Sequence, residues 1–231
     1  MVDLLQGYGA SLLQGAALTL AVALGALALA LVLGLAGAVA KLSGSAFWRL
    51  SATIYTTVIR GVPDLVLMML IFYGGQIALN AALEAIGRES VDIDPFAAGV
   101  ATLGFIFGAY FTETFRGAIQ AVPAGQVEAG HAFGMSGWLV FRRITAPQML
   151  RFALPSFTNN WLVLVKSTAL VSLIGLNDML QKAQQAAGAT RQPFTFYLAV
   201  GALYLAVTTV SVLALRALEQ RVSRGVKVAA L

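Results

Sequence analysis

The chain contains 231 residues, of which 59% are hydrophobic and only 11% are charged. An average soluble domain carries about 25% charged residues, so this composition excludes a soluble enzyme, a nucleic-acid-binding domain and a disordered chain. It predicts an integral membrane protein, in which the formal net charge of +5 is informative through the loops that carry it.

Five long uncharged intervals predict an all-α protein with five transmembrane helices. A bilayer crossing needs about 20 predominantly apolar residues in a helix. The intervals place the helices near residues 13–40, 53–80, 96–120, 155–178 and 194–217. We expect the fourth helix to begin near Pro155 and to end near Asp178, with Lys166 at mid-depth.

The lysine and arginine residues predict that the N-terminus lies outside and the C-terminus in the cytoplasm. With this orientation 11 basic residues fall on the cytoplasmic side, only Arg88, Lys182 and Arg191 fall outside, and Lys166 stays within the membrane. An excess of basic residues in cytoplasmic loops is typical of membrane proteins. The positive charge is therefore a topology signal, and no nucleic-acid partner is expected.

Small residues recur four positions apart in the first and third predicted helices. They are Ala30, Gly34, Ala38, Gly104 and Gly108. This spacing lets membrane helices approach closely. Two interpretations remain open: packing within the chain, or packing against a partner subunit.

The polar and basic loop at about 121–151 predicts a short helix, a turn and a second short helix. We expect the first helix to run from Glu128 to Phe133, the turn from Gly134 to Gly137, and the second from Trp138 to Ile144, where Pro147 ends it. Apolar side chains in this polar loop indicate a docking element, or a loop folded against its own membrane helices.

This loop resembles the coupling motif of binding-protein-dependent ABC importers. The motif has Glu-Ala-Ala, a Gly after three residues, an Ile after nine more, and Leu-Pro after one. Glu128, Ala129, Gly134, Ile144 and Pro147 stand at that spacing, while Gly130 and Ala146 replace a larger Ala and Leu. We expect these two smaller residues to weaken helix or docking contacts slightly.

Further segments resemble polar amino-acid permeases over most of the chain. These segments are Arg60–Pro63, Ala109–Gly117, Ile119–Pro123 and Lys166–Ser172. Residues Pro63–Met68, Ile71–Gly74 and Asp92–Pro95 are most similar to the Q-type membrane subunit of histidine / lysine-arginine-ornithine importers, with opine permease subunits (octopine, nopaline) as close relatives.

The resemblance implies the type I ABC importer permease (MetI-like) fold, with residues 1–231 as a single transmembrane permease domain. It implies that the chain is a multi-pass protein of the bacterial inner membrane with three kinds of protein partner: a second homologous permease chain, two ABC ATPase subunits and a periplasmic substrate-binding protein. The chain has no phosphate-binding loop of the Gly-x-x-x-x-Gly-Lys-Ser/Thr type, so we expect ATP and Mg on the ATPase partner and no cofactor here. The absence of cysteine and the single His131 argue against a metal site.

Polar residues in the membrane are candidates for a substrate path. They are Glu113, Asn159, Asn160, Lys166, Ser167 and Thr168. Lys166 has a second interpretation, an ion pair with Glu113 or Asp64 across the bundle, and Glu113 has another, a helix ion pair with Arg116. Permeases of the family that this chain resembles often carry an acidic residue near positions 160 and 167, and this chain does not. We therefore expect a heterodimer in which the partner chain supplies the anionic contact.

The sequence thus predicts a transport subunit without catalytic residues, importing polar, cationic amino acids such as histidine, arginine, lysine and ornithine. An opine permease subunit is the main alternative. A secondary transporter would show internal repeats, and a membrane scaffold would not need the spacing of residues 128–147.

Overall fold

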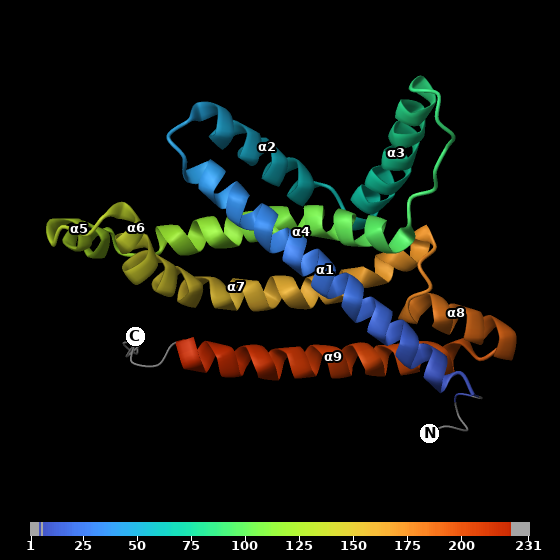
Figure 1. The fold of residues 1–231 in the computed structure, drawn as a ribbon. Coiled ribbons are helices and arrows are strands. Elements are labelled where there is room, and N and C mark those ends of the chain that lie inside the picture. The colour runs from blue at the N-terminus through green and yellow to red at the C-terminus, as the bar shows by residue number, and fades with distance from the viewer. Residues whose placement is uncertain (1–4, 6, 223–231) are drawn as a thin grey trace.

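The computed structural model describes residue 5 and residues 7–222, and helices account for nearly all of them (Figure 1). The elements in chain order are α1 Gly9–Leu42, α2 Ala46–Gly61, α3 Asp64–Ala85, α4 Pro95–Gln120, α5 Ala124–Ala132, α6 Gly137–Val140, the π-helical turn η2 Phe141–Thr145, α7 Ala146–Ser167, the 3₁₀ segment η3 Thr168–Ile174, α8 Met179–Thr190 and α9 Pro193–Val222. Arg224 and Lys227, which the charge count assigns to the cytoplasm, lie outside the described residues.

Five helical segments are long and apolar enough to cross a membrane, which confirms the predicted number. They are Gly9–Leu42, Asp64–Ala85, Pro95–Gln120, Gly137–Ile174 and Pro193–Val222. The beginning of α1 and the end of α9 lie at opposite ends of the bundle, and α5 and α6 lie at the end where α9 finishes (Figure 1). An odd number of crossings places the start of the first helix and the end of the last one on opposite sides of the membrane.

The centre of the molecule is the crossing of α1 and α4. Ala30 and Ala38 are completely buried, and a Cβ atom on Gly34 would lie 2.5 Å from the Cβ of Phe111. On α4, a Cβ atom on Gly104 would lie 2.8 Å from the Cβ of Leu29. The predicted small residues therefore pack the chain against itself, because only a missing side chain leaves room for the two backbones.

The prediction of one helix near residues 53–80 is wrong. The structure divides this region into α2 and α3 at Val62 and Pro63, and the membrane-length part begins at Asp64. Proline has no N–H and disfavours helical backbone in the preceding residue, and Val62 is extended at φ −111° and ψ 138°. Asp64 begins α3, and no ion pair joins it to Arg60 in the part of the chain that the structure describes.

The fourth predicted helix begins earlier than expected, so the predicted start near Pro155 is wrong. Pro147 does not end the second short helix either, because α6, η2 and α7 follow one another without a break. The π turn explains this continuity: Ala146 N–H bonds to Phe141 O, and Pro147 falls at the start of α7, where its missing N–H costs little. Pro155 lies inside α7.

The same helix ends earlier than expected, so the predicted end near Asp178 is also wrong. Helix α7 ends at Ser167, η3 continues to Ile174, and Gly175 at φ 94° turns the chain into α8. Asp178 is the N-cap of α8, and its side chain accepts a hydrogen bond from Gln181 N at 2.9 Å. Helix α8 was not predicted, although an aspartate before a run of alanine, glutamine and lysine is a helix-start signal.

Candidate functional site

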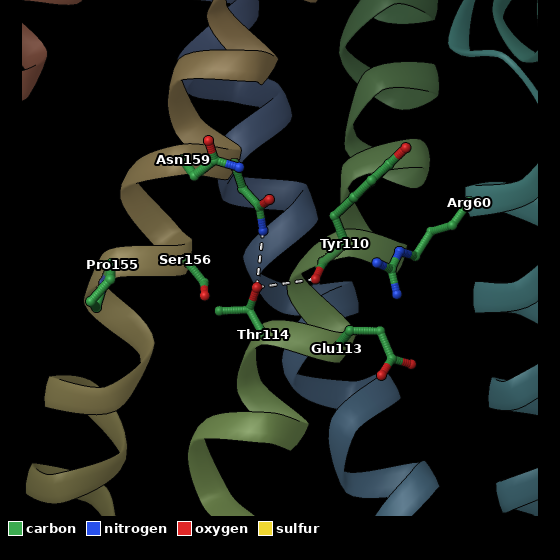
Figure 2. Close-up of a pocket in the computed structure, with 8 residues that line it drawn as sticks. Arg60, Tyr110, Glu113, Thr114, Pro155, Ser156 and Asn159 are labelled. Atoms are coloured by element: carbon green, nitrogen blue, oxygen red, sulfur yellow. Dashed lines mark hydrogen bonds between the residues drawn. The ribbon is translucent and has the colours of Figure 1, made fainter. Parts of the chain in front are cut away.

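A polar cavity of about 490 Å³ opens between α2, α4 and α7 (Figure 2). Its lining residues are Arg60, Tyr110, Glu113, Thr114, Pro155, Ser156, Asn159 and Asn160. The α4 residues are three and four positions apart and those of α7 follow the same spacing, so each helix turns one face toward the cavity. The volume falls within the range of about 300–1,000 Å³ that is typical of small-molecule sites.

A side-chain hydrogen bond joins helices α4 and α7 at the cavity, and a second one holds its acceptor within α4. Asn160 Nδ2 donates to Thr114 Oγ1 at 2.9 Å, and Thr114 Oγ1 donates to Tyr110 O at 3.2 Å (Figure 2). Asn159 is exposed and has no hydrogen-bond partner within the described residues. Its amide is therefore free to bind a polar ligand through both a donor and an acceptor.

The cavity contains one carboxylate, and that carboxylate is already paired. Glu113 Oε1 accepts a hydrogen bond from Lys41 Nζ of α1, and Glu113 Oε2 accepts from Arg116 Nη2 at 2.8 Å. The predicted ion pair between Glu113 and Arg116 is confirmed. Lys41 was not predicted as a partner, because 72 residues separate it from Glu113.

Arg60 is the cationic group of the cavity. Its Cζ atom lies 5.4 Å from the centroid of the Tyr110 ring, within the range of a cation–π contact. Since two cations hold Glu113, the cavity offers an arginine and neutral amides and hydroxyls. This arrangement suits an anionic group such as a carboxylate, and it has no free acid for a cationic side chain.

The structure brings together three of the six predicted path residues: Glu113, Asn159 and Asn160. Lys166 lies instead in a separate groove between α7 and α9. Ser167 is half-buried at the end of α7, and Thr168 is buried with its hydroxyl 3.4 Å from that of Tyr204. Neither lines the cavity. Lys166 is not paired with Glu113 or Asp64 in the described ranges.

Sequence reasoning did not assign Arg60, Tyr110, Thr114 or Ser156 to the cavity. Arg60 belongs to the Arg60–Pro63 segment that resembles polar amino-acid permeases. Its position in the cavity depends on the break at Pro63, which ends α2 and turns α3 away. The spacing of Tyr110, Glu113 and Thr114 on one helical face was a signal that could have found two of these residues.

The segment that resembles a coupling motif forms a knob of α5, α6 and η2 at one end of the molecule (Figure 1). Gly134 has φ 75° and makes the turn, and Ser136 caps α6 by accepting from Leu139 N. Glu128, Ala129 and Pro147 are exposed, whereas Ile144 is half-buried. The helix–turn–helix prediction is thus confirmed up to the end of the second helix.

The knob presents large apolar side chains to the surroundings. Phe133 is 89% exposed and Trp138 is 68% exposed, and the Trp138 and Phe141 rings stack with centroids 5.7 Å apart. These side chains do not fold back onto the chain's own membrane helices. An exposed aromatic cluster of this kind is typical of a protein–protein contact.

Gly130 has a structural reason to differ from the alanine of the motif. It is buried, and a Cβ atom there would lie 2.7 Å from Ile144 Cδ1 and 3.1 Å from Val140 Cγ2. The glycine lets α5 approach α6 and η2 closely. The residue acts inside the knob, and its effect on a docking contact stays a prediction.

Five membrane crossings, a polar cavity between helices and an exposed knob of short helices at one end define a polytopic membrane transport subunit. The model of the family described as "Binding-protein-dependent transport system inner membrane component" matches residues 30–224. The chain belongs to this family.

Sequence relatives extend the match over nearly the whole chain. The histidine/lysine/arginine/ornithine transport system permease protein HisQ of Escherichia coli (strain K12) is 56% identical over 97% of this chain and 98% of its own length. The octopine transport system permease protein OccQ of Rhizobium radiobacter is 41% identical over 96% of this chain and 94% of its own. The arginine ABC transporter permease protein ArtQ of Haemophilus influenzae is 40% identical over 92% and 95%.

Solved structures show the same fold. A chain of a crystal structure described as an amino acid ABC transporter with histidines is 32% identical, has a TM-score of 0.79, and matches 93% of this chain and 95% of its own. A chain of the MetNI methionine ABC transporter in an inward-facing conformation is 17% identical with a TM-score of 0.67, over the same shares of the two chains. The MetI-like fold is confirmed.

Family membership settles several predictions about the class of protein. The chain is an ABC transporter permease of the inner membrane, a transport subunit and not a catalytic enzyme. A binding-protein-dependent system implies a separate ATPase and a binding protein as partners. The secondary-transporter and scaffold alternatives are excluded.

Proposed function

We propose that this chain is the permease subunit of an ATP-driven importer of cationic amino acids, namely histidine, lysine, arginine and ornithine. The 56% identity to a permease of a histidine/lysine/arginine/ornithine system, over nearly the full length of both chains, is the observation that carries the proposal. The 41% identity to an octopine permease keeps opine transport as the second candidate.

In this proposal the substrate passes through the cavity of Figure 2. Arg60 binds the α-carboxylate of the amino acid, because a guanidinium can form two parallel charge-assisted hydrogen bonds with a carboxylate. Asn159 binds the neutral or amino portion, while Asn160 and Thr114 hold α4 and α7 together. Glu113 fixes α1 against α4 through Lys41 and stays out of direct contact with the substrate.

A cationic side chain then needs an acid that this cavity does not supply. We propose that a second, homologous permease chain provides it, so that the transmembrane unit is an asymmetric heterodimer. The pairing of the cavity's one carboxylate with Lys41 and Arg116 supports this proposal, since an already neutralised carboxylate attracts a cation weakly.

The knob of α5, α6 and η2 is proposed to dock on one of two ATPase subunits, with Glu128, Ala129, Gly134, Ile144 and Pro147 in the coupling motif. The exposed Phe133 and Trp138 would anchor the contact. Because η2 joins the knob to α7 without a break, a shift of the knob would move the helix that carries Asn159 and Asn160. The knob then lies in the cytoplasm, which places the N-terminus outside, in agreement with the basic residues.

Reconstitution in proteoliposomes with candidate permease, ATPase and binding-protein partners tests the substrate assignment. ATP hydrolysis is measured with each binding protein and a panel of histidine, lysine, arginine, ornithine, octopine and nopaline. We expect the four cationic amino acids to stimulate hydrolysis. Stimulation by octopine or nopaline and not by the amino acids would replace the proposal with the opine alternative.

A further inference from the structure

A second groove, of about 470 Å³, lies between α7 and α9 and shares no residue with the polar cavity. Its lining residues are Leu162 and Lys166 of α7 and Leu205, Thr208, Thr209, Val212, Leu213 and Arg216 of α9. Leu162 and Lys166 are four residues apart, as are Thr208, Val212 and Arg216. Each helix therefore turns one continuous face toward the groove.

The groove contains two positive charges and no negative charge. Lys166 and Arg216 are both exposed, and neither forms an ion pair or a side-chain hydrogen bond with another described residue. The carboxylate of Glu113 is occupied by Lys41 and Arg116 on the other side of α7. An unpaired cation within a membrane span is costly, so an anionic group from outside the chain would bind favourably near Lys166.

The groove is elongated and lies on the least buried helix of the bundle. Only 6% of the most apolar window of α9 is buried, so this helix faces its surroundings along most of its length. From Thr208 to Arg216 the helix rises about 12 Å, toward the end of the bundle where α5 and α6 lie. A fitting occupant has an anionic head at that end and an apolar body that contacts leucine and valine.

We propose that the α7–α9 groove is a binding site for an anionic phospholipid, such as phosphatidylglycerol or cardiolipin. Arg216 holds the phosphate at the end of the bundle where α5 and α6 lie, and Lys166 adds a second positive charge deeper in the groove. An acyl chain lies between them against Leu162, Leu205, Val212 and Leu213. Basic pockets between membrane helices are suited to such headgroups, and each nearby lysine or arginine attracts an anionic lipid. A zwitterionic lipid fits less well, because its headgroup carries no net charge.

Native mass spectrometry of the assembled transporter, titrated with phosphatidylglycerol or phosphatidylcholine, tests the proposal. We expect the wild type to retain phosphatidylglycerol preferentially. The Lys166→Gln/Arg216→Gln double variant should lose this preference by roughly tenfold or more, and each single variant should lose part of it. The Lys166→Arg/Arg216→Lys variant, which conserves both charges, should keep it.

Arg221→Gln is the matched control, because Arg221 lies on the same helix and is exposed but does not line the groove. We expect it to keep the lipid preference. Equal binding of the two lipids by the wild type would overturn the proposal, as would an unchanged preference in the double variant. If the isolated chain shows the preference but the assembled transporter does not, a protein partner covers the groove and the proposal is also wrong. The single variants keep the test decisive if the double variant fails to fold.

Discussion

Arg60 determines what the polar cavity can bind. Its guanidinium lies over the Tyr110 ring, and the cavity's one carboxylate is held by two other cations. The position therefore combines a fixed positive charge with the neutral amides of Asn159 and Asn160. A carboxylate is the complementary group, and every amino acid carries one.

We expect Arg60→Gln to reduce amino-acid uptake by roughly 10- to 100-fold, because a hydrogen bond to a charged group contributes about 1.5–3 kcal/mol. Arg60→Lys should retain part of the activity, since it keeps the charge and loses the planar fork. The measurement is uptake of labelled arginine in proteoliposomes. Arg88→Gln, in the α3–α4 loop, is the control, and full activity of Arg60→Gln would remove this residue from the path.

Asp178 is an acid held in an unfavourable environment. It is 1% exposed, Oδ2 has no hydrogen-bond partner in the described part of the chain, and burial raises its pKa to about 6. It lies between the membrane spans, where Met179 N donates to Thr19 Oγ1 of α1 at 3.3 Å. This carboxyl therefore influences how α8 is held against α1.

The raised pKa gives a pH dependence of stability with a definite sign. The folded state binds the Asp178 proton more tightly than the unfolded chain, so stability falls as the pH rises from about 4 to about 6 and changes no further above that range. The loss amounts to up to about 3 kcal/mol, and acidification restores it. We expect the melting temperature of the wild type, relative to Asp178→Asn, to rise as the pH is lowered over that interval. Asp94→Asn is the control, because Asp94 also caps a helix but is exposed. A constant difference between wild type and Asp178→Asn would contradict the assignment.

At the scale of elements, the crossing of α1 and α4 depends on glycine because glycine has no side chain. Gly104 and Gly117 lie on the same helix, but only Gly104 has α1 against it, whereas a Cβ atom on Gly117 would have no neighbouring atom within 4 Å. The two glycines therefore separate the effect of packing from that of helix propensity.

Gly104→Ala should destabilise the protein by about 1–3 kcal/mol, because the new methyl group forces α1 and α4 apart. Gly117→Ala should be neutral or stabilising, since alanine favours a helix by up to about 1 kcal/mol over glycine. Thermal unfolding in detergent is the measurement. Equal melting temperatures for the two variants would show that the helices are not in close contact at Gly104.

The knob of α5, α6 and η2 has separate inner and outer residues. Gly130 supports its packing from inside, whereas Phe133 at 89% exposure contributes to the outer surface alone. Gly134 requires a left-handed backbone conformation, φ 75°, that any other residue adopts with strain.

Phe133→Ser should leave folding unchanged, because Phe133 is exposed in the free chain. It should reduce substrate-stimulated ATP hydrolysis at least several-fold, because the phenylalanine becomes a buried anchor when the knob docks. Gly134→Asp and Glu128→Lys should also abolish coupling while the permease stays inserted in the membrane. Gly125→Ala on α5 is the control, as nothing lies near a Cβ there. Normal stimulation in all three variants would show that this surface does not contact the ATPase.

At the scale of the whole molecule, charge placement and hydropathy were enough to predict five crossings, and the glycines at 134 and 137 were enough to predict the turn between the two short helices. Helix boundaries near prolines were not predictable in the same way. Pro63 breaks a helix, Pro147 stands at a helix start because of a π turn, and Pro155 lies inside a helix. Each proline carries the same local restrictions, and tertiary packing selects the outcome.

Only some of the residues predicted to line the substrate path lie together in the structure, again because tertiary packing decides their neighbours. Asn159, Asn160 and Lys166 fall within two turns of one helix, but a helix face seven residues long does not reveal which neighbour it meets. The asparagines face α4, and Lys166 faces α9. The partners of Glu113 and Lys166 depend on contacts between residues distant in sequence, which one sequence does not contain.

The most direct test is uptake of labelled arginine into proteoliposomes that contain this chain, its homologous permease partner, the ATPase and the binding protein. We expect ATP-dependent accumulation with all components present, and none when the homologous permease is omitted. Arginine accumulation by this chain with the ATPase and binding protein alone would contradict the requirement for a second chain that supplies the acid. No accumulation with any cationic amino acid in the complete assembly would contradict the proposed function itself.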